Sequence, residues 1–157
     1  MLECGISKLS MEIKEAEKTD FEEVFALWQR AGLRTKDKER ETLEYTSMLE
    51  RNPNSCLIAV DRGDIVGTVL GTFNGRRAWI YHIVIDPEHQ GSGLGSKLMR
   101  EVEQKLRMAG ATKIVLGVHI TNLDTTAFYQ KLGFKVMNDA ILFEKDVYEK
   151  KGIPALN

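Results

Sequence analysis

The sequence has 157 residues and is poor in cysteine, in proline and in long apolar runs. Its two cysteines, Cys4 and Cys56, are not spaced as metal ligands, and no cluster of cysteine and histidine surrounds them. We therefore expect no bound metal and two free thiols, which are typical of a reducing compartment and favour the cytoplasm. The longest apolar stretches fall far short of the roughly 20 residues that a membrane-spanning helix needs, so no membrane association is expected.

Charge of one sign is also lacking. Lys and Arg number 22 and Asp and Glu number 23, which gives a net charge of −1. Without a strong positive field, neither nucleic acid nor an anionic membrane is expected as a partner, although a local basic pocket is compatible with this sum. A content of 43% hydrophobic and 29% charged residues is ordinary for a soluble globular protein.

The length suits one domain with a real core. Residues 1–10 lack the apolar centre of a signal peptide, and we expect them to be an extension without a role in the chemistry. Met11 begins a run that is typical of a first strand and helix. A single domain is therefore expected over 11–148, with a short tail over 149–157.

Hydrophobic periodicity predicts a mixed α+β domain built on one central sheet. Strands are expected at 11–16, 56–60, 65–73, 78–85, 113–120, 134–137 and 141–145, and helices at about 19–32, 36–50, 93–109 and 123–132. The resulting order is β-α-α-β-β-β-α-β-α-β-β. Thr19 and Glu22 have the spacing of a capping box at the first helix. Leu43 and Leu49 are the expected apolar anchors of the second helix.

The most informative segment runs from Ile83 to Ser96, where a buried strand, a glycine-rich turn and a helix follow one another. Such a turn presents free backbone N–H groups at a helix N-terminus, and glycine lets phosphate oxygens approach them closely. The spacing from Gly91 to Gly95 is one residue too short for a P-loop. The third glycine comes too early for a dinucleotide fingerprint. A tight turn without a ligand is the remaining alternative from this segment alone.

Two motifs together resemble one family. The run Gln90-Gly-Ser-Gly-Leu-Gly95 is similar to the Q-x-x-G-x-G pyrophosphate motif of the GNAT acetyltransferases. The run from Asn122 to Phe134 is similar to the family's N-x-x-A-x-x-x-Y-x-x-x-G-F, with Thr125 in place of the usual alanine. The resemblance extends from Met11 to the last expected strand. It implies a GNAT-like fold, with a mostly antiparallel sheet of about six to seven strands and a splay between the fourth and fifth.

The resemblance also implies a function. Acetyl-CoA is the expected cosubstrate, and its acetyl group is expected to move to an amine of a small molecule or peptide by direct attack in a ternary complex. The pantetheine arm is expected on the backbone of Ile83, Val84 and Ile85 and on Asn122, which also suits a helix N-cap. The pyrophosphate is expected on the turn and helix start formed by Gln90, Gly91, Ser92, Gly93, Leu94, Gly95 and Ser96.

Tyr129 matches the family tyrosine near the coenzyme sulfur, and its implied role is general acid to the leaving thiolate. Many relatives place a glutamate base on the fifth strand, where this chain has Gly117. His82 and His119 are the candidate replacements, because histidine titrates near neutrality. A water chain ending on backbone carbonyls, or an acceptor amine with a lowered pKa, are the alternatives.

The acceptor stays open at this stage. Five cationic residues cluster in the first helix pair: Arg30, Arg34, Lys36, Lys38 and Arg40. They either recognise an anionic acceptor or form a solvated surface of mixed charge. The short turn at Asn138-Asp139 argues against N-terminal acetylation. A lysine or N-terminal protein acetyltransferase and an acyl-CoA-binding module without turnover are the rival functions, and the resemblance leaves a homodimer open.

Overall fold

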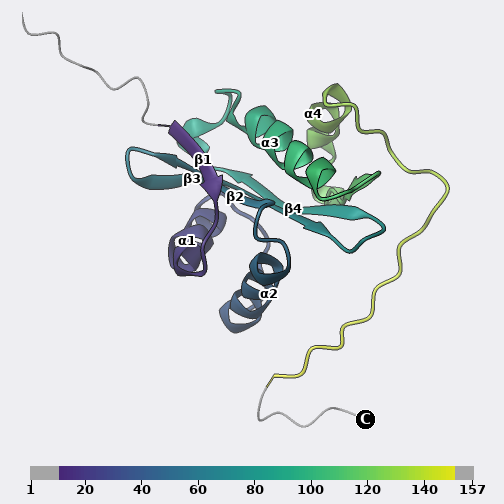
Figure 1. Cartoon of the computed structure of the whole chain (residues 1–157), viewed down its shortest axis with the longest axis horizontal. Coiled ribbons are helices and arrows are strands. Elements are labelled where there is room, and N and C mark those ends of the chain that lie inside the picture. The colour runs from purple at the N-terminus through teal and green to yellow at the C-terminus, as the bar shows by residue number, and fades with distance from the viewer. Residues whose placement is uncertain (1–10, 151–157) are drawn as a thin grey trace, which may run out of the picture. The chain divides into compact units, whose positions relative to one another are not determined.

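The structure, a computed structural model, describes residues 11–150 (Figure 1). The expected extension over 1–10, and most of the tail, lie outside this range. The chain divides into two compact units, Met1–His119 and Ile120–Asn157, and each is described by itself. A single domain over 11–148 therefore stays a prediction.

The first unit is built on a five-stranded sheet in the order β1-β2-β3-β4-β5. Neighbouring strands are antiparallel except for β4 and β5, which are parallel. The strands are β1 (Met11–Glu15), β2 (Cys56–Asp61), β3 (Asp64–Phe73), β4 (Ala78–Ile85) and β5 (Ile114–Leu116). The mostly antiparallel mixed sheet is thus confirmed, and its strands follow the alternating apolar runs of the sequence.

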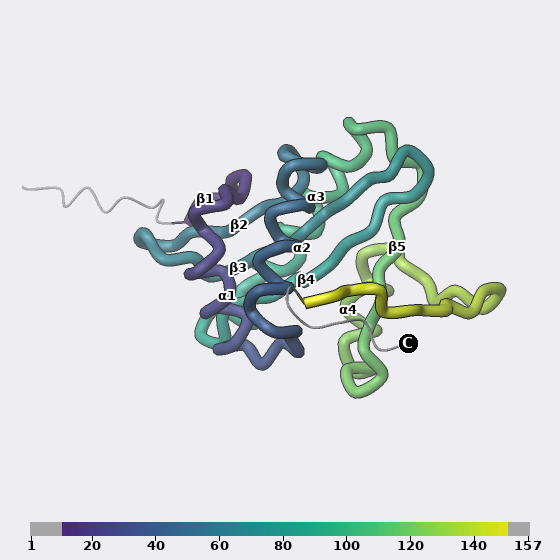
Figure 2. Tube along the Cα trace, turned by 90° about the horizontal axis from the view of Figure 1, so that it is seen from below, coloured from purple at the N-terminus to yellow at the C-terminus, as the bar shows by residue number. Residues whose placement is uncertain are grey.

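Three helices cover the sheet of this unit: α1 (Phe21–Arg30), α2 (Lys38–Arg51) and α3 (Leu94–Met108). Helices α1 and α2 lie on one face and α3 lies on the other (Figure 1). Figure 2 looks onto the face that carries α1 and α2. Gly71 lets α3 approach the sheet closely, because a Cβ there would lie 2.5 Å from Cγ2 of Val102.

The core between α1, α2 and the sheet is aromatic. Trp28 and Tyr45 are fully buried, and Phe21 packs against both rings at centroid distances of 6.3 and 5.1 Å. The Tyr45 hydroxyl donates to the carbonyl oxygen of Glu17, which satisfies its one polar atom. This cluster holds α2 in place against α1 and therefore fixes the side chains that α2 presents beside β4.

Three local expectations in this unit are wrong. The first helix begins with a 3₁₀ turn, Lys18–Asp20, and the Asp20 carboxylate accepts the Glu17 N–H, so the box expected at Thr19 and Glu22 does not form. Leu43 is exposed and Tyr45 anchors α2 instead. Strand β5 covers only Ile114–Leu116 of the expected 113–120, because its partner β4 bulges away beyond Ile80.

The second unit contains a 3₁₀ segment, Ile120–Thr125, and helix α4 (Thr126–Lys131), which ends at Gly133 with a positive φ of 91°. The strands expected at 134–137 and 141–145 are not formed among the described residues. Most of their apolar side chains are exposed and their backbone joins no ladder. A strand exists only where a partner completes its hydrogen bonds. The sheet therefore has five strands rather than the expected six to seven.

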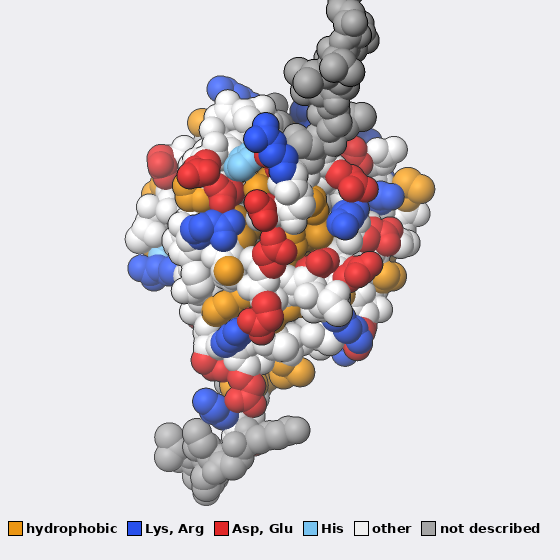
Figure 3. Space-filling view, turned by 90° about the vertical axis from the view of Figure 1, so that its left-hand side faces the viewer, with side chains coloured by type: hydrophobic (Ala, Val, Ile, Leu, Met, Phe, Trp, Pro, Cys, Tyr) orange, Lys and Arg blue, Asp and Glu red, His pale blue; other side chains and the backbone are white. Residues whose placement is uncertain are grey.

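The surface carries both signs of charge. On the face drawn in Figure 3, acidic and basic side chains are interspersed and neither sign gathers into a patch. Among the helices of residues 11–150, none has the length and apolar character needed to cross a bilayer.

Candidate active site

The centre of the candidate site is a bulge in β4. Thr68 of β3 pairs with Val84 and Leu70 pairs with Tyr81, so His82 and Ile83 together face the single residue Val69. His82 adopts the left-handed region with φ of 50°, which histidine tolerates better than β-branched residues do. The bulge turns the His82 side chain toward the face that carries α1 and α2.

Buried polar contacts fix this bulge. The Thr68 hydroxyl donates to the His82 carbonyl oxygen at 3.1 Å and accepts from Nε1 of Trp28 at 3.0 Å. The Trp28 ring also meets the imidazole of His82 edge to face, with centroids 4.7 Å apart. The position of the imidazole is therefore set by the core and not by solvent.

A buried carboxylate faces the same imidazole. Glu41 of α2 is only 3% exposed, and its Oε2 lies 3.7 Å from Nε2 of His82. Its Oε1 accepts the backbone N–H of Lys36 at 2.7 Å. Burial lowers the pKa of His82 from its ordinary value, while the Glu41 carboxylate opposes that shift. His82 is thus neutral at pH 7, with an anion placed to stabilise its protonated form.

The backbone edge of β4 next to the bulge is open on the side of β5. Only Ala78, Trp79 and Ile80 pair with β5, so Ile83–Ile85 lie beyond the end of that ladder. This is the expected splay between the fourth and fifth strands. Among the residues the structure describes, no strand pairs with this edge, which leaves its backbone groups available to an extended ligand, apart from the Ile85 carbonyl oxygen that accepts from Gln90.

The glycine-rich loop follows directly from this edge. Gly91 and Gly93 have φ of 77° and 84°, conformations that favour glycine. Helix α3 begins at Leu94 without a side-chain cap, and its first backbone bond runs from Lys97 to Gly93. The N–H groups of Leu94, Gly95 and Ser96 consequently have no helical acceptor, which is the donor set that an anion requires. Gln90 bonds back to the Ile85 carbonyl oxygen, and Ser92 to that of His89.

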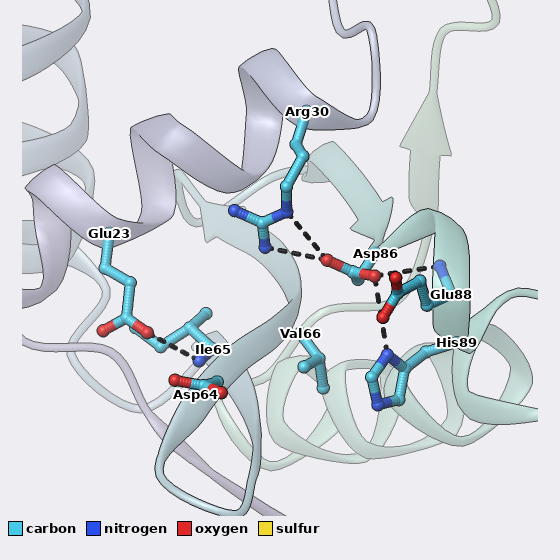
Figure 4. A pocket seen from close by; sticks show the side chains of 8 residues that line it. All are labelled: Glu23, Arg30, Asp64, Ile65, Val66, Asp86, Glu88 and His89. Atoms are coloured by element: carbon cyan, nitrogen blue, oxygen red, sulfur yellow. Dashed lines mark hydrogen bonds and ion pairs between the residues drawn. The ribbon is translucent and has the colours of Figure 1, made fainter.

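An ion-pair cluster anchors the start of this loop (Figure 4). Nε and Nη2 of Arg30, on α1, both lie 2.8 Å from Oδ2 of Asp86. The other Asp86 oxygen accepts the Glu88 N–H. His89 lies between two carboxylates, with Nε2 2.9 Å from Asp61 and Nδ1 3.5 Å from Asp86. The loop is therefore tied to α1 and to β2 before its first glycine.

The pKa shifts in the cluster follow from these contacts. Burial by itself would raise the pKa of Asp86, but hydrogen bonds from the Glu88 N–H and Arg30, together with the nearby His89, lower it overall. The hydrogen bond with Asp61 raises the pKa of His89 against the effect of burial, and Asp86 adds to the rise. His89 and its two carboxylates thus stabilise one another in their charged forms.

The remaining motif residues lie in the second unit. Asn122 has a non-helical backbone (φ −114°, ψ 31°) and is exposed, and it does not cap α4, whose N-cap position is Thr125. Tyr129 is half-buried and packs between Phe128 and Phe134, with ring centroids 5.1 and 6.2 Å away. Burial raises the pKa of Tyr129, so its hydroxyl keeps its proton at neutral pH.

The other candidates are less suited to proton transfer or nucleophilic attack. His119 is exposed and its Nε2 lies 3.3 Å from Nη1 of Arg34. Cys56 is buried, which raises the pKa of its thiol to about 12 and keeps it from acting as a nucleophile. No atom would lie within 4 Å of a Cβ on Gly117, so packing does not require a glycine there.

Comparison with known proteins agrees with this geometry. Residues 13–134 match the model of the acetyltransferase (GNAT) family. The chain belongs to the GNAT family. It is therefore an acetyltransferase enzyme of the GNAT type, and the resemblance carried by the two motifs is confirmed.

Two GNAT relatives cover nearly the whole chain. Acetyltransferase SG1711 of Sodalis glossinidius is 31% identical over 88% of this chain and 97% of its own length. Acetyltransferase plu1384 of Photorhabdus laumondii is 33% identical over 86% of this chain and 94% of its own length. The solved PaiA N-acetyltransferase of Thermoplasma acidophilum, in complex with coenzyme A, shares the fold with a TM-score of 0.70 and 19% identity, over 84% of this chain and 94% of its own.

Sequence reasoning did not single out Glu41 and His89, and it placed Arg30 only in the cationic cluster of the first two helices. Glu41 stands in a highly charged helix where every acidic residue has the same sequence signature. Arg30 meets Asp86 only through the packing of α1 beside the end of β4, and His89 meets Asp61 only where the loop lies beside β2. The one available signal was Asp86-Pro87, an acid placed between a buried strand and a glycine-rich turn.

Proposed function

We propose that this GNAT enzyme moves the acetyl group of acetyl-CoA to an amine of a small molecule or peptide, by direct attack within a ternary complex. The observation that carries the proposal is the open edge of β4 at Ile83–Ile85, which runs directly into the glycine loop. A backbone edge suits the amides of a pantetheine arm, and the loop suits a pyrophosphate.

The donor set of the loop fits that ligand. Gly91 and Gly93 place no Cβ over the loop, and the unpaired N–H groups from Leu94 to Ser96 converge at the start of α3. One helix N-terminus contributes only about 0.3–1 kcal/mol per charge, so several amides acting together must hold the pyrophosphate. We propose that all seven residues from Gln90 to Ser96 take part, and that Asn122 bonds the pantetheine arm.

The acceptor amine must lose a proton before it attacks. An alkyl ammonium with a pKa of about 10.4 is almost fully protonated at pH 7. We assign the general base to His82 rather than His119, because His82 is held neutral by burial and faces Glu41. The Glu41 carboxylate faces Nε2, and we propose that it favours the tautomer protonated there, with Nδ1 receiving the amine proton. Glu41 is thus a positioning residue.

Acetyl-CoA supplies the acetyl group as a thioester. In the proposed step the amine nitrogen forms a bond to the acetyl carbon, the carbon–sulfur bond breaks, and Tyr129 gives its hydroxyl proton to the departing sulfur. The aromatic packing that keeps Tyr129 protonated supports this role. Because a thiol has a pKa near 8.5, the sulfur leaves tolerably without help, and the contribution of Tyr129 is at the low end of the usual range.

Calorimetric titration tests the coenzyme. Acetyl-CoA should bind with one-to-one stoichiometry and ATP only weakly, and dephospho-CoA measures what the terminal phosphate adds. A folded protein that binds no acetyl-CoA would refute the proposal. In an acceptor screen, Tyr129→Phe should lower kcat by about a hundredfold or less, while leaving the affinity for acetyl-CoA unchanged.

A protein lysine or a protein N-terminus is the alternative acceptor. An assay that compares free amines with peptides as acetyl acceptors distinguishes a small-molecule acceptor from a protein acceptor. The residues that follow α4 form no hairpin among those described, so the sequence argument from the short turn at Asn138-Asp139 stays a prediction.

A further inference from the structure

A long groove leads away from His82. It has a volume of about 980 Å³, lies between α2 and the β3–β4 hairpin, and is lined only by residues of the first unit. Its lining runs along β4 from Arg77, before the strand, to His82 in the bulge. At a rise of about 3.3 Å per residue, these two positions are roughly 16 Å apart. The groove has room for a ligand well beyond a simple amine.

The floor of the groove is largely apolar. Trp79 and Tyr81 lie on the same face of β4, two residues apart. Their ring planes are nearly parallel, with an interplanar angle of 15° and centroids 6.4 Å apart. Tyr81 is 42% exposed although it lies on the sheet face that α1 and α2 cover. Phe73 and Met48 line the same groove. An elongated apolar body is the ligand that such a surface favours.

The charges of Lys36 and α2 at the His82 end are already balanced, and Arg34 at this end contacts His119. Lys36 bonds Glu44 through both carboxylate oxygens, at 2.8 and 3.0 Å, and Arg40 lies 3.4 Å from the same carboxylate. Glu41 is engaged by the Lys36 N–H and by His82. This end therefore offers a proton acceptor and no unbalanced cation from α2.

The other end has two arginines, of which Arg51 is next to a glutamate, Glu50, that Lys18 already pairs. The Asn52 side chain accepts the Phe73 N–H at 2.8 Å, which joins the end of α2 to the end of β3. Arg51 and Arg77 line the groove at this junction. Within residues 11–150 neither forms an ion pair with a carboxylate, and Arg77 donates only to the carbonyl oxygen of Arg76. Guanidinium groups bind carboxylate or phosphate oxygens in a two-pronged geometry.

We propose that the acceptor is an amine with an elongated apolar body and a carboxylate or phosphate group at the end opposite the amine. The amine lies at His82, the body lies on Trp79 and Tyr81, and the anionic group binds Arg77 and Arg51. This assignment rests on the proposed function. A plain α-amino acid does not satisfy it, because its amine and carboxylate are held by the same carbon.

The test compares rigid acceptors of matched shape. An aminomethyl-biphenyl that bears a carboxylate at its far para position is assayed beside its phosphonate and its uncharged carboxamide. We expect an anionic compound to have a kcat/KM at least about tenfold above that of the carboxamide, mainly through KM, as for one charge-assisted hydrogen bond. Which of the two anions is preferred identifies the natural group.

Arg77→Gln should remove this preference, and Arg51→Gln should weaken it. Arg76→Gln is the matched control, because Arg76 is adjacent and exposed but does not line the groove. Equal kcat/KM for all three compounds would overturn the proposal, and so would a neutral peptide acceptor that exceeds them. If no amine is acetylated at all, the proposed function fails. The anion subsite can then still be tested by calorimetry without coenzyme. Binding of the anionic compound to the Arg76→Gln control but not to Arg77→Gln would support it.

Discussion

His82 and His89 lie close in sequence but respond to protons in opposite ways. His82 is buried against Trp28, so burial lowers its pKa, whereas His89 is paired with Asp61 and Asp86, which raise its pKa. The first is suited to accept a proton during turnover. The second is suited to stay protonated and hold the loop.

The pH profile tests the pair of His82 and Glu41. Catalysis needs neutral His82, so kcat/KM should fall as pH drops through a pKa below 6.5. Because Glu41 is the group that raises this pKa, Glu41→Gln should move the acid limb to still lower pH. His82→Asn, whose side chain also tolerates a positive φ, should lower kcat by about 10²–10⁴ and remove that limb. An unchanged limb in His82→Asn would assign the base elsewhere.

His89 makes a prediction about stability. A pKa raised by folding means that protonated His89 contributes stability fully below its unfolded value of about 6.5, and loses it as pH rises through the folded pKa. His89→Gln should therefore unfold more easily by about 1 kcal/mol at pH 6 and by less at pH 9. Urea denaturation at the two pH values measures this, and an equal loss at both would mean that the ion pairs contribute nothing.

At the scale of elements, the junction of β4, the glycine loop and α3 depends on backbone conformation. Gly93→Val places a branched side chain at φ 84° in the loop, which we expect to abolish acetyl-CoA binding while the fold persists. Gly63→Val is the matched control, because Gly63 has φ 83° in the turn between β2 and β3. Thermal unfolding followed by circular dichroism should show a similar loss of stability in both variants. Calorimetry should show a loss of affinity for acetyl-CoA only in Gly93→Val. Normal affinity in Gly93→Val would place the pyrophosphate elsewhere.

The sequence predicted most elements because their signals are local. Alternating apolar residues and the Asn74-Gly75 turn mark the β3–β4 hairpin, and the amphipathic spacing of Leu94, Leu98 and Val102 marks α3. Tyr45 was missed as the anchor of α2 because its burial depends on an aromatic cluster that α1 and α2 form together. The pairing of Glu41 with His82 was missed for the same reason, since it needs both the β4 bulge and the docking of α2.

At the scale of the whole molecule, coenzyme binding and folding are linked. A ligand that binds only the native state adds about 2.7 kcal/mol at a concentration of 100 times its Kd, and each kcal/mol raises Tm by roughly 2–4 °C for a chain of this size. Acetyl-CoA should thus raise Tm by about 5–10 °C, and ATP at equal concentration by much less. A Tm unaffected by saturating acetyl-CoA would contradict native-state binding.

The chain has only two tryptophans, and both stand at points where the reaction is proposed to occur. Trp28 touches the imidazole of His82, and Trp79 lies on the groove floor. A protonated imidazole quenches indole fluorescence, so in Trp79→Phe the remaining emission becomes an optical indicator of the charge on His82. In Trp28→Phe the emission instead reports occupancy of the groove. The scarcity of this one residue type gives the protein two separable built-in probes.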